Sequence, residues 1–188
     1  FGIFILSEDI IRALFGRGEF NNEDVLITSK ILLVYSFSLP GYMLARIFNQ
    51  VFYSYEKVEY PVKAAVPTFI CNFILCFLLY RPLGVLGLAI SGAVSIWLNL
   101  FIQIFYLRKN FGSFYEKLLI FDFKKLLKIL ISSIIMVISI LIFKKILDLN
   151  IYLDLFIQIL IGLIIYFLIL NWLKLNEIKL VFQLNKFN

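Results

Sequence analysis

The feature that most constrains this chain is a series of long apolar stretches, each close to the length of a membrane span. A helix needs about 20 mostly apolar residues to cross the hydrocarbon core of a bilayer. Five stretches meet this requirement: Val25–Tyr53, Tyr60–Tyr80, Val85–Leu107, Leu126–Phe143 and Ile151–Leu173. A sixth stretch, Phe1–Phe15, is typical of the end of a span. Because helices satisfy their own backbone hydrogen bonds in lipid, the sequence predicts an all-α polytopic membrane helix bundle with five complete spans plus the end of a sixth.

The composition excludes the main classes of soluble protein. The chain has 188 residues, of which 62% are hydrophobic and 16% are charged, whereas soluble domains have roughly 45–50% and 25%. A domain of this size buries only about two-thirds of its surface, so it could not hide so much apolar area from water. A soluble enzyme, a disordered tail and a nucleic-acid-binding domain are therefore excluded. Because the chain starts inside an apolar run without an initiator Met, we expect it to be part of a longer protein.

The basic residues predict how the spans are oriented, because Lys and Arg are enriched in cytoplasmic loops. One alternate set of loops holds eleven of them: Lys57, Lys63, Arg108, Lys109, Lys117, Lys124, Lys125, Lys128, Lys174, Lys179 and Lys186. The other set holds six: Arg12, Arg17, Lys30, Arg81, Lys144 and Lys145. The first set and the C-terminus are therefore expected on the cytoplasmic side.

Polar residues recur at helical spacing inside two neighbouring apolar stretches. The third stretch carries Gly87, Ser91, Ser95, Asn99 and Gln103, and the second carries Ala64, Thr68, Asn72 and Cys76. Residues four apart share one helix face, so the two stripes are expected to face each other or a wet cavity. Close helix packing is the simpler explanation, and a direct ligand role is the alternative. For such a role Asn72 is the best candidate, because its amide oxygen suits a small cation.

Arg46 is the only full charge well inside an apolar stretch. Two interpretations are open, since the side chain can snorkel to the cytoplasmic surface or face an aqueous cavity and attract an anionic substrate. Its neighbours Asn49 and Gln50 favour a wet environment. The candidate residues of a substrate path are Arg46, Asn49, Gln50, Ser91, Ser95 and Asn99.

Pro40 and Gly41 lie in the middle of the first long stretch and are hinge candidates. Proline removes one helix hydrogen bond and glycine loosens the backbone, so a kink is expected there. The last two stretches carry few polar residues and are rich in Ile, Leu and Phe. A groove for a lipid tail between them would explain that composition, but simple exposure to lipid explains it equally well.

The sequence offers no constellation of catalytic residues. It contains no histidine, and its acidic residues all lie at the ends of the apolar stretches or between them. Cys71 and Cys76 lie inside one apolar run, where neither a disulfide framework nor a metal cluster is expected. We therefore expect the chain not to be an enzyme and to carry no cofactor.

Several ordered motifs resemble the MurJ/MviN family of lipid II flippases. They are Ser7–Phe20, Tyr35–Gly41, Phe52–Ser54, Pro61–Lys63, Asn72 and Arg81–Ala89, which includes the Pro-Leu-Gly turn. The resemblance covers about residues 1–110 and is only architectural beyond them. It is the combination of motifs in order, and not any one of them, that is specific.

The resemblance implies the C-terminal part of a fourteen-helix transporter of the MOP exporter superfamily. Residues 1–110 would then run from the end of the ninth helix through the twelfth helix of the C-terminal lobe. Residues 111–125 would form a cytoplasmic interfacial linker, 126–175 the last two transmembrane helices, and 176–188 a cytoplasmic tail. Both termini of the whole transporter would lie inside, which agrees with the distribution of basic residues.

The function implied is transport of the lipid-linked peptidoglycan precursor lipid II. Members of the family flip the undecaprenyl-pyrophosphate-linked substrate from the cytoplasmic to the periplasmic leaflet of the bacterial inner membrane by alternating access. The expected partners are this substrate, the lipid bilayer and the N-terminal portion of the same transporter. Nucleic acid is not expected as a partner. The last two helices are linked in the family to a groove for the polyprenyl tail.

The resemblance also implies a candidate sodium site and two ways of coupling. Asn72 matches one ligand of a sodium ion that some members bind, whereas Cys76 stands where Asn or Asp is usual. Either a sodium ion or the membrane potential would then drive the cycle.

Alternative functions remain open at this stage. A polysaccharide flippase of the O-antigen type and a multidrug exporter belong to the same superfamily. A membrane-embedded lipid-linked transferase belongs to a different class and would need clustered carboxylates or histidines near one leaflet.

Overall fold

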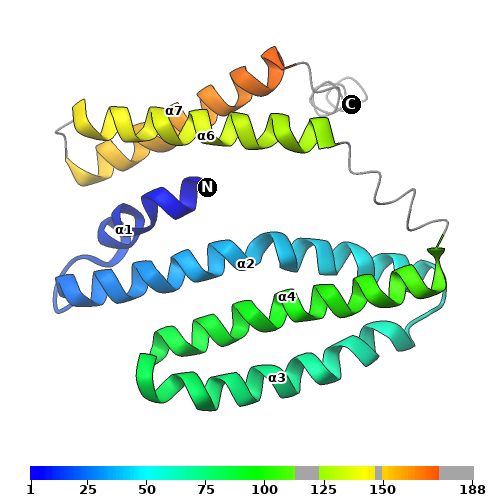
Figure 1. The fold of residues 1–188 in the computed structure, drawn as a ribbon. Coiled ribbons are helices and arrows are strands. Elements are labelled where there is room, and N and C mark those ends of the chain that lie inside the picture. Colours follow the sequence, from blue (N-terminus) through cyan, green and yellow to red (C-terminus); the bar gives the residue numbers. More distant parts are fainter. Residues whose placement is uncertain (113–122, 147–149, 174–188) are drawn as a thin grey trace, which may run out of the picture. The chain divides into compact units, whose positions relative to one another are not determined.

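The computed structural model describes residues 1–112, 123–146 and 150–173, and over these residues it contains helices and no strand. The helices are α1 (Gly2–Phe15), α2 (Asn22–Ser54), α3 (Glu59–Leu83), α4 (Val85–Asn110), α6 (Phe123–Ile146) and α7 (Ile151–Trp172) (Figure 1). Five of these, with the Leu127–Lys144 part of α6, are long and apolar enough to cross a membrane. The predicted all-α bundle of five spans and the end of a sixth is therefore confirmed. Most of the predicted linker 111–125 and all of the tail 176–188 lie outside the described residues.

The start of α2 is fixed by a capping box. The side chain of Asn21 accepts a hydrogen bond from the backbone N–H of Asp24 at 2.9 Å, and the Asp24 carboxylate accepts one from the backbone N–H of Asn21 at 3.0 Å. Such a pair satisfies two of the amide groups that a helix start leaves without an internal partner. Helix α2 therefore begins three residues before the apolar stretch that predicted it.

Residues 17–112 form one compact unit, in which α4 packs against both α2 and α3 (Figure 1). Its buried core joins Ala45, Phe48 and Phe52 of α2 to Leu100 and Leu107 of α4. Aromatic rings continue this core, since the Phe52 ring lies 5.6 Å from the ring of Tyr60 and 6.1 Å from that of Phe111. Aromatic pairs in these geometries add to the free energy gained from burial.

The connection between α3 and α4 is a single glycine. Gly84 has φ +56° and ψ −134°, a conformation that residues with a Cβ rarely adopt. Because the turn is so short, α4 starts directly against the end of α3, and Gly87 lies against the backbone of Leu79. A Cβ on Gly87 would come within 2.3 Å of the Leu79 carbonyl oxygen. These two glycines explain how the Pro-Leu-Gly turn brings the polar stripes of α3 and α4 together.

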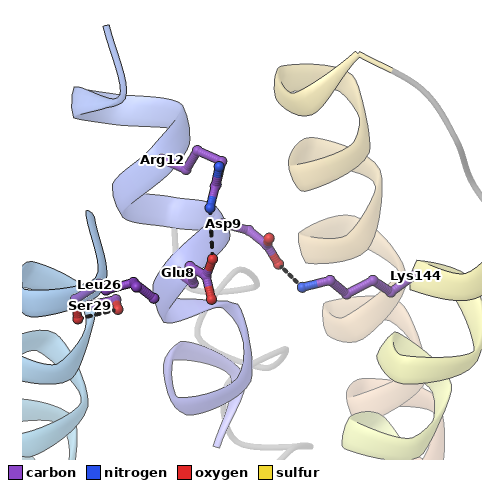
Figure 2. A network of polar contacts seen from close by, with 6 residues as sticks. All are labelled: Glu8, Asp9, Arg12, Leu26, Ser29 and Lys144. Carbon is purple, nitrogen blue, oxygen red and sulfur yellow. Dashed lines mark hydrogen bonds and ion pairs between the residues drawn. The ribbon is translucent and has the colours of Figure 1, made fainter. Parts of the chain in front are cut away.

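Helices α1, α6 and α7 belong to a second compact unit. Helix α7 approaches α6 at Gly162, where a Cβ would lie 3.0 Å from the Cδ1 of Ile140. Figure 2 shows the Asp9 carboxylate of α1 pointing toward the ammonium group of Lys144, with which it forms an ion pair, and Arg12 paired with Glu8 along α1. At the other end of α6, Lys128 donates to the backbone carbonyl of Leu173 at 2.7 Å.

Substituting Gly87 by alanine should destabilise the α3–α4 pair, because the added methyl group meets backbone rather than a flexible side chain. Overpacking of this kind costs about 1–3 kcal/mol. The expected result is a lower midpoint in thermal unfolding of the detergent-solubilised protein. Gly92→Ala is the matched control, because no atom lies within 4 Å of a Cβ at that position of the same helix. Equal midpoints for the two variants would contradict the packing argument.

Candidate functional site

A groove of about 570 Å³ lies between α2, α3 and α4 and is the candidate functional site. Each helix contributes one strip of its surface to it. The lining residues are Tyr42, Ala45, Arg46, Asn49, Ala65, Thr68, Phe69, Asn72, Gly92, Ser95, Ile96 and Asn99. None of these is acidic, and Arg46 is the one lining residue with a full charge. The guanidinium, amides and hydroxyls among these residues make the groove more polar than the apolar surfaces around it.

The structure brings most of the predicted path residues into this groove and excludes two of them. Arg46, Asn49, Ser95 and Asn99 line it, as does the candidate ion ligand Asn72. Gln50 is exposed and does not line the groove, although it lies one helical turn after Arg46.

Ser91 is fully buried and does not line the groove. Its hydroxyl donates to the backbone carbonyl of Leu88 at 2.7 Å and lies 2.9 Å from the thiol of Cys76. Ser95 donates to the carbonyl of Ser91 at 2.7 Å. The polar stripe of α4 therefore serves helix packing at Ser91 and turns toward the groove at Ser95 and Asn99.

A chain of hydrogen bonds connects the three helices next to the groove. Gln103 of α4 donates to the amide oxygens of Asn49, at 3.0 Å, and Asn99, at 2.6 Å. Asn99 in turn donates to the hydroxyl of Thr68 at 3.3 Å, and Thr68 donates to the backbone carbonyl of Ala64 at 2.7 Å. Gln103 is buried, whereas Asn49, Thr68 and Asn99 are half-buried and line the groove. Buried polar groups joined in this way hold neighbouring helices in a fixed register.

One neighbour of Asn72 is a sulfur atom. The thiol of Cys76 lies 3.5 Å from the amide oxygen of Asn72 and 2.9 Å from the hydroxyl of Ser91. Hard cations take several oxygen ligands and do not favour sulfur. Among the described residues there is also no group of three or more His, Cys, Asp or Glu side chains that could hold a metal ion. The role of Asn72 as an ion ligand stays a prediction, and no step proposed below passes through an ion.

The hinge candidates lie in a helix that continues without a break. Helix α2 is helical on both sides of Pro40. Gly41 is buried, and a Cβ there would lie 3.3 Å from Ile96 and from the ring of Trp97. The glycine therefore allows α2 to approach α4 closely, which is a packing role. Hinge motion at Pro40 and Gly41 stays a prediction.

Thr68, Tyr42 and Gln103 are three residues outside the predicted substrate path that matter at this site. Thr68 lines the groove and ends the hydrogen-bond chain, and Tyr42 lines the groove from α2. The signal for Tyr42 was its spacing of four residues from Arg46. For Thr68 and Gln103 the signal was their place in the polar stripes, but spacing alone could not show which stripe residues contact each other.

Comparison with known proteins identifies relatives of this chain. The family model described as lipid II flippase MurJ matches residues 1–161. A probable lipid II flippase MurJ of Buchnera aphidicola subsp. Schizaphis graminum is 31% identical over 137 residues, covering 72% of this chain and 26% of that protein. One of Aquifex aeolicus is 46% identical over 65 residues, covering 35% of this chain and 13% of that protein.

A solved structure has the same fold. It is described as lipid II flippase MurJ in an inward closed conformation, and it matches with a TM-score of 0.72 and 27% sequence identity. The match covers 89% of this chain and 33% of that one. The chain thus spans about a third of the solved relative and a quarter or less of the curated relatives above.

If the groove is hydrated, a cysteine in it should react with a membrane-impermeant thiol reagent. The thiolate is the reactive form, and an apolar environment suppresses it. In a protein lacking Cys71 and Cys76, we expect Asn72→Cys to be labelled about tenfold faster than Phe73→Cys. Phe73 is the matched control because it is the next residue of α3, is 68% exposed and does not line the groove. Equal labelling rates would show that the groove is no wetter than the lipid-facing surface.

Proposed function

This chain belongs to the lipid II flippase MurJ family, and from that premise we propose that it forms part of a flippase for a lipid-linked peptidoglycan precursor. The substrate would be an undecaprenyl-pyrophosphate-linked headgroup that moves from the cytoplasmic to the periplasmic leaflet. In this proposal the chain is a transporter and not an enzyme. The observation that carries it is the groove between α2, α3 and α4, in which Arg46 lies among neutral amides and hydroxyls.

Arg46 would interact with the anionic part of the substrate. A charged side chain in the middle of a membrane helix costs about 2.5–3.5 kcal/mol on insertion scales. That cost falls where the side chain reaches a hydrated groove, and it is offset further when an anion pairs with the guanidinium group. In a hydrogen bond from a guanidinium to a phosphate both the donor and the acceptor are charged, and such bonds are among the strongest in proteins. The groove therefore suits a headgroup that carries phosphate.

The apolar tail of the substrate would stay outside the groove. Helices α6 and α7 expose large apolar side chains along much of their length, among them Ile134, Ile138, Leu163 and Phe167. Such a surface fits an acyl or polyprenyl chain and needs no polar partner. Headgroup and tail would thus cross the membrane in different environments, the first hydrated and the second in lipid.

Alternating access would open the groove to one leaflet at a time. Moving one charge across the membrane potential changes its free energy by about 2.3 kcal/mol per 100 mV, so the potential alone is able to bias the cycle. The proposed partners in this cycle are the N-terminal portion of the same transporter and the lipid bilayer. The proposed location is the bacterial inner membrane, with the C-terminus in the cytoplasm.

Replacing Arg46 by glutamine should impair transport strongly. Hydrogen bonds to a charged group contribute about 1.5–3 kcal/mol, so we expect at least about a tenfold loss of flux. Arg46→Lys keeps the positive charge but loses the forked arrangement of N–H donors. Its flux should lie between that of the original protein and that of Arg46→Gln. The measurement is growth of cells depleted of their own flippase together with the rate at which labelled lipid II reaches the outer leaflet.

Arg81→Gln is the control for this experiment. Arg81 is exposed in the last turn of α3 and does not line the groove. Its loss should leave the flux within about twofold of the original, the range of most surface substitutions. Normal transport by Arg46→Gln would overturn the proposed role of the groove.

The orientation can be tested with reporters. A fluorescent protein fused to the C-terminus should fold and emit, because it would lie in the cytoplasm, and alkaline phosphatase fused there should be inactive. The same phosphatase inserted between Gly16 and Asp24 should be active, because that loop is expected outside. The opposite pattern of activities would reverse the proposed topology and the assignment of the basic loops.

A further inference from the structure

The buried amide of Gln103 decides which hydrogen-bonding groups the groove offers. Gln103 is 1% exposed and does not line the groove. It nevertheless holds the side chains of two residues that do, Asn49 and Asn99. A primary amide can turn either its oxygen or its N–H groups toward a ligand. The partner that fixes the amide therefore determines whether it donates or accepts.

The direction of this network is set by the backbone of α3. The Thr68 hydroxyl has one hydrogen, which it donates to the carbonyl of Ala64. Toward Asn99 it can then offer only lone pairs, so Asn99 must donate with its N–H group. In that orientation the amide oxygen of Asn99 faces Gln103, so Gln103 must donate an N–H group to it. The same Gln103 nitrogen then donates to the Asn49 oxygen.

The groove as a result presents mainly donors. The amide oxygen of Asn49 accepts a hydrogen bond from Gln103. What Asn49 offers to the groove is therefore its N–H groups. Arg46 adds a guanidinium, which has five N–H donors and no acceptor. The acceptors among the lining side chains are the hydroxyls of Tyr42, Thr68 and Ser95 and the amide oxygen of Asn72, and no carboxylate lines the groove.

Gln103 itself has a feature that packing does not explain. Its own amide oxygen is buried without a hydrogen-bond partner. A buried acceptor without a partner lowers stability, which offsets part of what the two hydrogen bonds donated by Gln103 contribute. The net contribution of Gln103 to stability is therefore expected to be small.

We propose that Gln103 is a positioning residue that orients the amides of Asn49 and Asn99, so that the groove selects anions of the phosphate class over neutral polar ligands. Gln103 does not touch the ligand and acts only through these two side chains. The inference rests on the proposed function, because it deepens the chemistry of the same groove.

The test measures binding of inorganic pyrophosphate to the intact, detergent-solubilised protein, together with its thermal unfolding midpoint. Gln103→Met keeps the length of the side chain but removes the amide, so Asn49 is free to turn its oxygen toward the groove. We expect pyrophosphate to bind about three- to tenfold more weakly, the effect of losing one oriented neutral donor. The midpoint should change little, because the loss of two donated hydrogen bonds is offset by removal of the acceptor without a partner. A purely structural role predicts the reverse, a lower midpoint and unchanged affinity.

A matched pair at Thr68 tests the direction of the network. Thr68→Ser keeps the hydroxyl that fixes Asn99 and should bind pyrophosphate as the original protein does. Thr68→Val has almost the same shape without the hydroxyl, and should weaken binding as Gln103→Met does. Equal affinity in the two Thr68 variants would contradict the proposed direction of the hydrogen bonds from Thr68 through Asn99 to Gln103.

Arg46→Gln separates failure of this inference from failure of the proposed function. If Arg46→Gln binds pyrophosphate as tightly as the original protein, or if the original protein binds none, the groove is not an anion site and both proposals fail. If Arg46→Gln loses binding while Gln103→Met retains it, the groove stands and only the positioning role of Gln103 is overturned. A fall in both affinity and midpoint for Gln103→Met would also overturn that role, since misfolding would then account for the loss.

Discussion

A polar group inside a bilayer has to find its hydrogen-bond partner within the protein, and the unit formed by α2, α3 and α4 is organised around that requirement. Its polar side chains bind one another or nearby backbone carbonyls. Ser91 bonds to Leu88, Ser95 to Ser91, and Thr68 to Ala64. Gln103 completes the set by joining α4 to Asn49 of α2. The contacts that hold the helices in register are thus the same ones that orient the side chains of the groove.

Small residues make these polar contacts possible, because they let helix backbones come close enough for short side chains to meet. Gly87 lies against the backbone of Leu79, and Gly41 lies against the ring of Trp97. The same device recurs in the other compact unit, where Gly162 faces Ile140. Membrane helices gain little from burying one apolar surface against another, so close approach and directed hydrogen bonds take over the role that the hydrophobic effect has in water.

The sequence was sufficient to predict the spans, because the length of an apolar run is a direct physical requirement of the bilayer. The stretch Val85–Leu107 became α4, which starts at Val85 and ends at Asn110. The groove was predictable only in part. Helical spacing identified Ser95, Asn99 and Asn72, but the same spacing included Ser91, which is buried. Which face of a helix meets a groove depends on the rotation of that helix against its neighbours, and this is set by contacts between residues far apart in sequence, such as Gln103 with Asn49.

Arg46 is where the two interpretations of the sequence meet. Snorkelling explains why a cation is tolerated in a membrane helix, but it does not require polar residues on neighbouring helices. A polar groove does require them, and the structure has them. The amides of Asn49 and Asn99 line the same groove as Arg46, and their oxygens accept hydrogen bonds from Gln103. A site arranged in this way has positive charge and N–H donors directed into one space. An anion entering it would gain hydrogen bonds without first displacing an internal partner, whereas a cation would meet the guanidinium and find few acceptors. The selectivity of the groove thus follows from hydrogen bonds that the ligand never touches.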